Sequence, residues 1–134
     1  MNVLPGIIQQ IQTEGHLSLV RIKVDNDLFS SIVIDTPQTA SYLAIDTKID
    51  ILFKENEVVI AKSFSGQISM QNRFVCTIRS IEKGKLLSKL VLNYHQHTIT
   101  SLITTNATEQ LQCIVGDQVI AMVKTNEISL SPHD

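Results

Sequence analysis

Apolar and polar residues alternate along much of this chain, and the alternation returns after 70 residues. Val20, Ile22 and Val24 alternate with charged residues, and Leu90 and Leu92 hold the places equivalent to the first two. A period of two is typical of a strand with one buried face. The pattern therefore predicts two copies of one β-rich unit, which together fill all 134 residues.

The strand pattern is dense in both copies. The predicted strands cover residues 6–11, 20–24, 29–34, 49–54 and 58–61 in the first copy, and 76–81, 90–94, 99–104, 119–124 and 128–130 in the second. Five short strands in so few residues predict a small barrel. We divide the sequence into a first domain at 1–64, a short polar linker at 65–68 and a second domain at 69–134.

One short helix is expected in each copy. Thr36 can cap the first helix, with Pro37 at its first position, where a missing N–H costs nothing. In the second copy Asn106 can cap, and Glu109 follows at the spacing of a capping box. The predicted fold class is all-β, with two tandem five-stranded small barrels that each carry one short helix.

Size and cysteine content indicate how such units are stabilised. Units of roughly 65 residues have marginal cores, so extra burial must come from an interface, a metal or disulfides. Cys76 and Cys113 do not occupy equivalent positions, and both replace small or apolar residues of the first copy. We interpret them as reduced core thiols, which suits a reducing compartment and leaves interfaces as the source of stability.

Charge and hydropathy narrow the possible functions. A net charge of −2 provides no cluster of cations for a nucleic-acid backbone. No apolar run is long enough for a membrane-spanning helix, and the N-terminal sequence does not have the pattern of a signal peptide. We therefore expect a soluble cytoplasmic protein that does not insert into membranes.

The order of short motifs resembles a known family. The second copy contains Asn72, Ile81-Glu82-Lys83-Gly84, Ser101-Leu102-Ile103-Thr104, Gly116-Asp117 and Lys124-Thr125-Asn126-Glu127-Ile128, and the first contains Asn2-Val3-Leu4-Pro5-Gly6 and Lys54-Glu55-Asn56-Glu57-Val58. This order resembles the molybdenum-pterin-binding, or molbindin, family (Mop, TOBE domain) in its tandem di-domain form. The resemblance implies OB-like barrels, a homotrimer around a threefold axis, and binding of molybdate or tungstate between domains and subunits, without an organic cofactor.

A tetrahedral dianion offers only acceptor oxygens, so its pocket needs converging donors. Fixed neutral dipoles can supply much of the attraction, which allows a protein of negative net charge to hold an anion. With the family pattern in view, the candidate oxyanion-binding residues are Ser69, Gln71, Asn72, Ser101, Thr104, Lys124, Thr125 and Asn126 in the second copy, and Asn2, Ser31, Lys54 and Asn56 in the first.

The sequence departs from the family pattern at three places. Gln71 stands where the family motif Ser-x-Arg-Asn has arginine, Glu55 directly follows Lys54, and Ile34 replaces the hydroxyl of Thr104. The second copy is therefore expected to supply more ligands, and a full site is expected to combine surfaces of both copies or of different chains. The function predicted is storage, buffering or homeostasis of molybdate or tungstate.

Other functions are weighed against this one. A TOBE-type regulatory or assembly module that has lost its ligand is one alternative, for which Gln71 and Glu55 are the reason. An OB-like single-stranded nucleic-acid binder is another, although the chain has only six aromatic residues for stacking bases. His95 and His97 lack further ligands nearby for a metal site. No catalytic motif is present, so we do not expect an enzyme.

Overall fold

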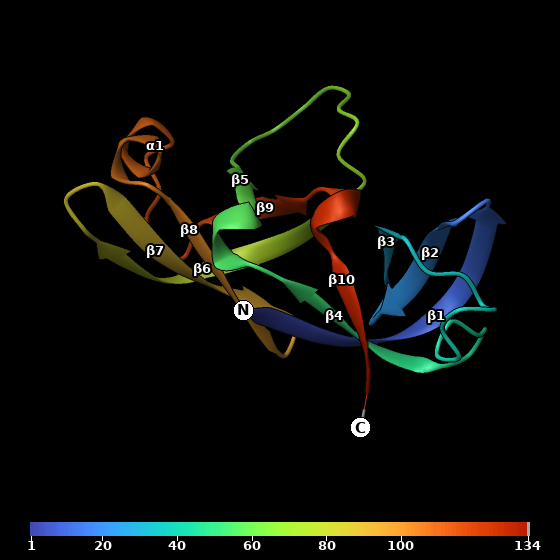
Figure 1. Cartoon of the computed structure of the whole chain (residues 1–134). Helices are drawn as coiled ribbons and strands as arrows, with labels where there is room; N and C mark the ends of the chain where they lie inside the picture. The colour runs from blue at the N-terminus through green and yellow to red at the C-terminus, as the bar shows by residue number, and fades with distance from the viewer. Residues whose placement is uncertain (134) are drawn as a thin grey trace.

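The structure, a computed structural model, describes residues 1–133 and consists of two β-sheet lobes. Each lobe is a five-stranded antiparallel sheet, with the orders β10-β4-β1-β2-β3 in lobe 1 and β5-β9-β6-β7-β8 in lobe 2 (Figure 1). Lobe 1 contains β1 (Asn2–Glu14), β2 (Leu17–Val24), β3 (Asp27–Val33), β4 (Lys48–Phe53) and β10 (Ser129–Pro132). Lobe 2 contains β5 (Val59–Ala61), β6 (Asn72–Lys83), β7 (Leu87–Tyr94), β8 (His97–Thr104) and β9 (Gln118–Val123). The all-β prediction of two five-stranded units is confirmed.

The two copies exchange their last strands. β5 follows β4 in the sequence, yet it pairs with β9 of lobe 2, where Val59 faces Met122. β10 ends the second copy and pairs with β4 of lobe 1, where Leu130 faces Ile51. The sequence pattern did not predict this exchange. The division of the sequence into domains at residues 65–68 stays a prediction. Each sheet contains one edge strand, β10 or β5, from the other side of that division.

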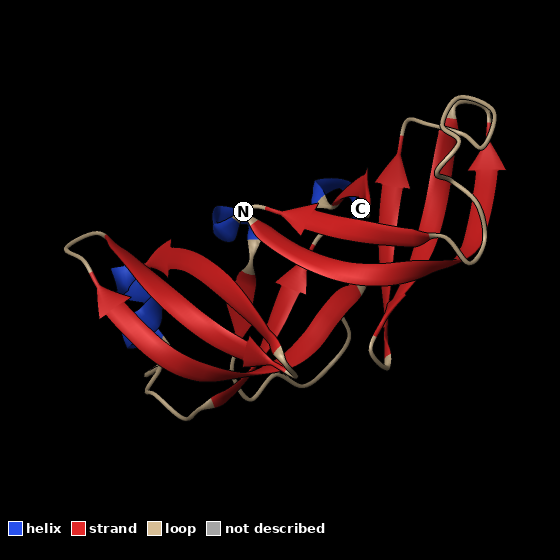
Figure 2. Cartoon of the chain, turned by 90° about the horizontal axis from the view of Figure 1, so that it is seen from below, coloured by secondary structure: helices blue, strands red, loops and turns tan. Residues whose placement is uncertain are grey.

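A long central strand shapes each lobe. The first half of β1 pairs with β4 and its second half pairs with β2, with an irregularity in the register between Ile8 and Gln10. In lobe 2, β6 has the same irregularity at the equivalent place, between Ile78 and Ser80. Bulges of this kind bend a strand and increase its twist. The bend curls each sheet until its edge strands contact each other, which is the OB-like curvature visible in Figure 2.

Aromatic side chains join the cores of the two lobes. The ring centroids of Phe29 in lobe 1 and Phe74 in lobe 2 are 5.2 Å apart, and Phe74 lies 4.9 Å from Tyr94. All three side chains are buried, and they belong to one cluster that spans both sheets. Tilted aromatic pairs at these distances add to the burial of apolar area. The shared core is the extra interface that two such small units were expected to need.

Only the second copy forms the predicted α-helix, α1 (Thr105–Gln110). Its cap is Thr104, not Asn106, because the Thr104 hydroxyl accepts a hydrogen bond from the Ala107 N–H at 3.0 Å. The equivalent residues of the first copy are Ile34, which has no acceptor, and Pro37, which has no N–H. Residues 36–40 therefore form a single hydrogen-bonded turn, and the helix predicted after Thr36 is wrong.

Two short 3-10 helices follow the sheets' inner strands. They are η1 (Glu55–Glu57), after β4, and η2 (Thr125–Glu127), after β9. Each packs against the other lobe, η1 on β8 and η2 on β3. In both lobes the chain therefore crosses between the sheets directly after a lysine, Lys54 or Lys124.

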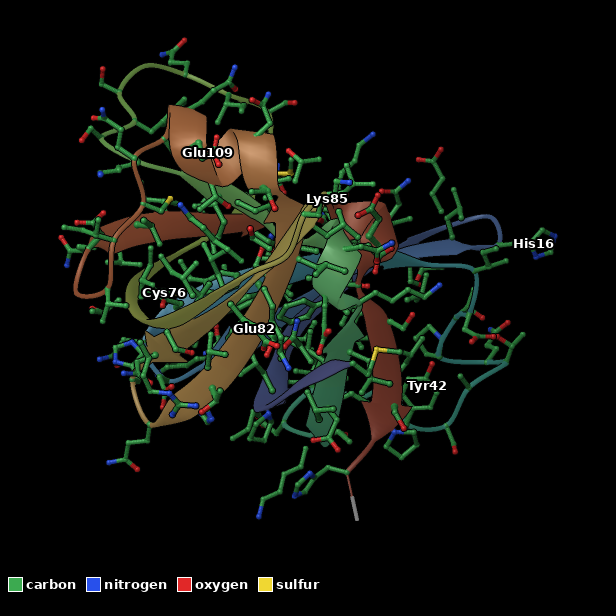
Figure 3. The ribbon with its side chains drawn as sticks, turned by 90° about the vertical axis from the view of Figure 1, so that its left-hand side faces the viewer. His16, Tyr42, Cys76, Glu82, Lys85 and Glu109 are labelled. Atoms are coloured by element: carbon green, nitrogen blue, oxygen red, sulfur yellow. The ribbon has the colours of Figure 1, made fainter. Side chains whose placement is uncertain are left out.

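Both cysteines are free and buried, which confirms their interpretation as reduced core thiols. Burial first, and the nearby carboxylate of Asp27 second, raise the pKa of the Cys76 thiol to about 12. Figure 3 shows Cys76 among packed side chains. In the described part of the chain, no helix combines the length and apolar character needed to cross a membrane.

Candidate functional site

The two lobes meet at two seams that are equivalent under the repeat. In the first seam the Asn2 amide exchanges two hydrogen bonds with the backbone of Thr100: its Nδ2 donates to the Thr100 carbonyl at 2.9 Å, and the Thr100 N–H donates to Asn2 Oδ1 at 2.8 Å. In the second seam Asn72 Nδ2 donates to the Ser30 carbonyl at 2.8 Å and the Ser30 N–H donates to Asn72 Oδ1 at 2.7 Å. Each asparagine thus acts as a short extra piece of strand on the edge of the other lobe.

A serine closes each seam beside the asparagine. Ser31 Oγ donates to the carbonyl oxygen of Ile128 at 2.7 Å, and Ser101 Oγ donates to that of Val58 at 2.9 Å. The two contacts are reciprocal, because Ser31 and Ser101 are equivalent residues, and so are Val58 and Ile128. This is the pattern of a twofold-symmetric interface, here formed within one chain.

Four of the predicted ligand donors are therefore part of the lobe interface. Asn2 is 5% exposed, Asn72 1%, and Ser31 and Ser101 0%. Their polar groups already bond the backbone, as buried polar groups require. These residues instead fix the position of the exposed residues at the start of η1 and η2 and of those that precede β6.

The second seam gathers most of the exposed candidates. Asn72 faces Val123 across the β6–β9 ladder, so the next residues outward, Gln71 and Lys124, adjoin each other where both strands end. Gln71, Lys124 and Asn126 are exposed and Thr125 is half-buried. Ser69 is also exposed and precedes Gln71 by two residues. Hydroxyl, amide and ammonium donors thus share one edge of lobe 2, beside β3 of lobe 1.

The first seam has a different chemistry at the equivalent edge. Lys54 and Asn56 are exposed there, but Met1 stands at the place of Gln71. Glu57 Oε1 accepts a hydrogen bond from the Lys54 backbone N–H at 2.8 Å, and Glu55 Oε2 lies 3.8 Å from the N-terminal ammonium. Glu57 has an equivalent in the second seam, Glu127, but Glu55 stands where that seam has Thr125. This additional carboxylate makes the first edge less suitable for an anion than the second.

Thr104, the remaining oxyanion candidate, and the two histidines that were weighed as metal ligands all have other partners. Thr104 caps α1 at the far end of β8, three strand residues from Ser101, or about 10 Å along the strand. His97 Nε2 lies 3.1 Å from Asp25 Oδ2 and His95 Nε2 lies 3.9 Å from Asp27 Oδ2. Within residues 1–133 no group of three or more His, Cys, Asp or Glu side chains has a geometry suited to a metal ion.

Comparison with known families gives a match in the second copy. The sequence profile of the TOBE domain matches residues 68–130, a range that includes the exposed donors of the second seam. The second copy is therefore similar to a TOBE domain. The resemblance seen in the short motifs is thereby confirmed, and β5 is the one strand of lobe 2 that lies outside the matched TOBE range.

Solved structures extend the likeness to both lobes. The cytoplasmic molybdate-binding protein ModG, in a crystal form with molybdate bound, matches with a TM-score of 0.92 and 22% identity, over 98% of this chain and 96% of that chain. A molybdate-binding protein from Sporomusa ovata is 32% identical over 44% of this chain and 88% of that chain, with a TM-score of 0.43. Comparison of the sequence with curated proteins gives no match. The ModG likeness shows that the fold of this chain, including both lobes, is a known architecture.

Proposed function

We propose that this protein binds molybdate or tungstate, with a site at the second seam. The observation that carries the proposal is the likeness over nearly the whole chain to ModG, a protein described as binding molybdate. The exposed donors Gln71 and Lys124 adjoin each other in the part of the chain that matches the TOBE domain, and Ser69 precedes Gln71 by two residues. They are the donor types that a tetrahedral oxyanion accepts.

Each residue of the site has a role in this proposal. The Lys124 ammonium supplies the positive charge, and the side chains of Ser69, Gln71 and Thr125 donate hydrogen bonds. Asn126, Asn56 and Lys54 contribute only where a second chain brings another edge close. Asn72 and Ser31 position the site through the contacts they make across the seam. Thr104 caps a helix elsewhere and is left out of the site.

The cellular role follows from the same proposal. We place the protein in the cytoplasm, as ModG is described, and assign it storage or homeostasis of the anion without catalysis. A homotrimer would bring the edges of neighbouring chains together and complete the coordination that a single edge leaves open. Gln71 in place of the family arginine lowers the positive charge of the site, so we expect weaker binding than an arginine would give.

Isothermal titration with molybdate, tungstate and sulfate at moderate salt tests the proposal. We expect saturable heat with the first two anions. Lys124→Ala should weaken binding at least tenfold, about 1.4 kcal/mol, which is the scale of a charge-assisted hydrogen bond. Lys89→Ala is the control, because Lys89 is an exposed lysine of β7 that is not among the candidate ligands, and it should leave binding unchanged. Gln71→Arg should tighten it.

Failure of the wild-type protein and of Gln71→Arg to bind any of the anions would overturn the proposal. The TOBE-type assembly module without a ligand would then be the better description. The nucleic-acid alternative has less support in the structure, because Phe29, Phe53, Phe74 and Tyr94 are buried and cannot stack on bases.

A further inference from the structure

A cavity of about 410 Å³ lies on lobe 1, and no asparagine or serine of the two seams lines it. Its lining residues are Pro5, Gly6, Ile7, Lys23, Asp25, Lys48 and His133. They come from β1, the end of β2, the start of β4 and the residue that follows β10. None of the residues predicted to bind an oxyanion is among them.

Two lysines flank the floor of this cavity. Ile7 on β1 faces Lys23 on β2 and Lys48 on β4. Side chains directly opposite each other in an antiparallel sheet point to the same face. The two lysines are therefore on one face, separated by two strand spacings, or about 10 Å. Long flexible side chains at that separation can both reach a small ligand placed above Ile7.

One carboxylate, that of Asp25, lines the cavity together with the two lysines. In the described part of the chain neither Lys23 nor Lys48 forms an ion pair. Asp25 is held by His97, at 3.1 Å from its Nε2, and Asp50 by His133, at 2.7 Å from its Nδ1. Both carboxylates thus have a histidine partner and not a lysine partner, and His133 itself lines the cavity.

The second copy provides an internal comparison. A cavity of about 400 Å³ lies over the equivalent residues Val75, Cys76 and Thr77 of β6. There Asn93 occupies the place of Lys23 and Gln118 the place of Lys48. The same fold and a cavity of similar size therefore form with neutral amides at these two places, although Arg73 also lines the second cavity. The fold does not require the paired lysines of lobe 1, so their charge needs another explanation.

We propose that the lobe 1 cavity is a second anion site, which binds a small dianion of the phosphate type between Lys23 and Lys48. The two ammonium groups bind oxygens on opposite sides of the anion, and the apolar surface of Pro5 and Ile7 lies beneath it. Two ammonium groups on one face repel each other. A dianion between them attracts both, and this attraction outweighs the repulsion. The site is chemically distinct from the second seam, where a single lysine acts with hydroxyl and amide donors.

Titration of the full chain with inorganic phosphate at constant ionic strength, followed by ¹H–¹⁵N NMR, tests this proposal. The Gly6 and Ile7 amides should shift along a saturable curve. The double variant Lys23→Asn with Lys48→Gln carries the residues that the second copy uses at these places, so it is expected to fold. It should lose at least tenfold in phosphate affinity. Lys89→Asn, an exposed lysine of β7, is the control and should behave as wild type.

The reciprocal double variant makes the test independent of any loss of stability. Asn93→Lys with Gln118→Lys should create a new saturable response at Cys76 and Thr77 in lobe 2. Shifts at Gly6 that do not saturate, or that persist unchanged without the two lysines, would overturn the proposal and indicate an adventitious ion only. Lys124→Ala separates the two sites, because it should weaken molybdate binding and leave the phosphate response at Gly6 intact.

Discussion

His97 Nε2 lies 3.1 Å from Asp25 Oδ2, and this contact joins the β7–β8 turn of lobe 2 to the β2–β3 turn of lobe 1. The reciprocal contact, His95 with Asp27, spans 3.9 Å. Asp25 and His95 occupy equivalent places, and both have a φ of 52°, so the two turns have the same shape and opposite chemistry. An acidic turn facing a histidine turn favours contact between unlike lobes, whereas two like lobes would place carboxylates against each other.

This contact should contribute a small, measurable energy. The His97 side chain is 26% exposed and that of Asp25 41%, so solvent screens the pair. A double-mutant cycle with Asp25→Asn and His97→Gln, measured by urea unfolding at pH 6 and low salt, should give a coupling of about 0.2–1 kcal/mol. The cycle between Asp25 and His95, which do not pair, should give a value near zero. Equal coupling in the two cycles would contradict the pairing.

Loss of either seam asparagine should be far more destabilising. Asn72→Ala removes two hydrogen bonds and leaves the Ser30 N–H and carbonyl without their partners in a buried place. We expect a loss of about 1–3 kcal/mol in the free energy of unfolding. Asn2→Ala should have a similar effect at the equivalent seam.

The matched control for these variants is Asn126→Ala, because Asn126 is an exposed asparagine next to the same seam. Its effect should stay within about 0.5 kcal/mol. All three variants are measured by chemical denaturation, and the dependence of the unfolding free energy on denaturant concentration is fitted separately for each. If Asn72→Ala were as mild as Asn126→Ala, the assignment of Asn72 to the lobe interface would be wrong.

Cys76 should be inert towards thiol reagents in the folded protein. Burial raises the pKa of its thiol to about 12, so almost none of the reactive thiolate is present at pH 8. We expect no labelling by Ellman's reagent within minutes at pH 8, and labelling of both cysteines after unfolding in urea. Fast labelling of Cys76 in the native protein, located by mass spectrometry, would contradict the packed core seen around it.

Ionisation of Asp117 should make the stability of the folded protein depend on pH. Its Oδ2 accepts a hydrogen bond from the Ile114 N–H at 2.9 Å and lies 2.9 Å from Lys62 Nζ. The hydrogen bond first, and Lys62 second, lower the pKa of Asp117 from its ordinary value of 3.8. A lowered pKa in the folded state contributes stability above pH 3.8, and that contribution is lost as the pH falls through the folded value.

The measurement is the melting temperature of wild type and Asp117→Asn between pH 6 and pH 2.5. The variant should melt lower at pH 6, and the difference should narrow below the ordinary pKa of an aspartate. Glu109→Gln alters an exposed carboxylate on α1 and serves as the control (Figure 3). A difference that stays constant with pH would show that Asp117 acts through packing alone.

Much of the fold could be predicted because the strand pattern is strong and occurs twice. Val20, Ile22 and Val24 are all buried on the inner face, as their alternation predicts. The exchange of β5 and β10 could not be predicted. Alternation specifies which face of a strand is buried, but it does not specify which of two similar sheets the strand joins.

The site was harder to predict because donor residues in a sequence do not show what they bond. Asn2 and Asn72 were interpreted as ligand donors, yet each begins an inward-facing series, followed by Leu4 and Ile8 or by Phe74 and Ile78. An asparagine at an inward position is buried and must find a partner within the protein. That alternation was the signal in the sequence for a role at the interface.

The exchanged edge strands also bear on how a two-copy chain could arise. A protein made of one copy would have to exchange its last strand with a separate molecule, and its folding would then depend on protein concentration. Fusing two copies makes the strand exchange intramolecular, at an effective concentration set by the short connection between β5 and β6. The pairing of the halves thereby becomes insensitive to dilution, while each half is free to acquire side chains of its own.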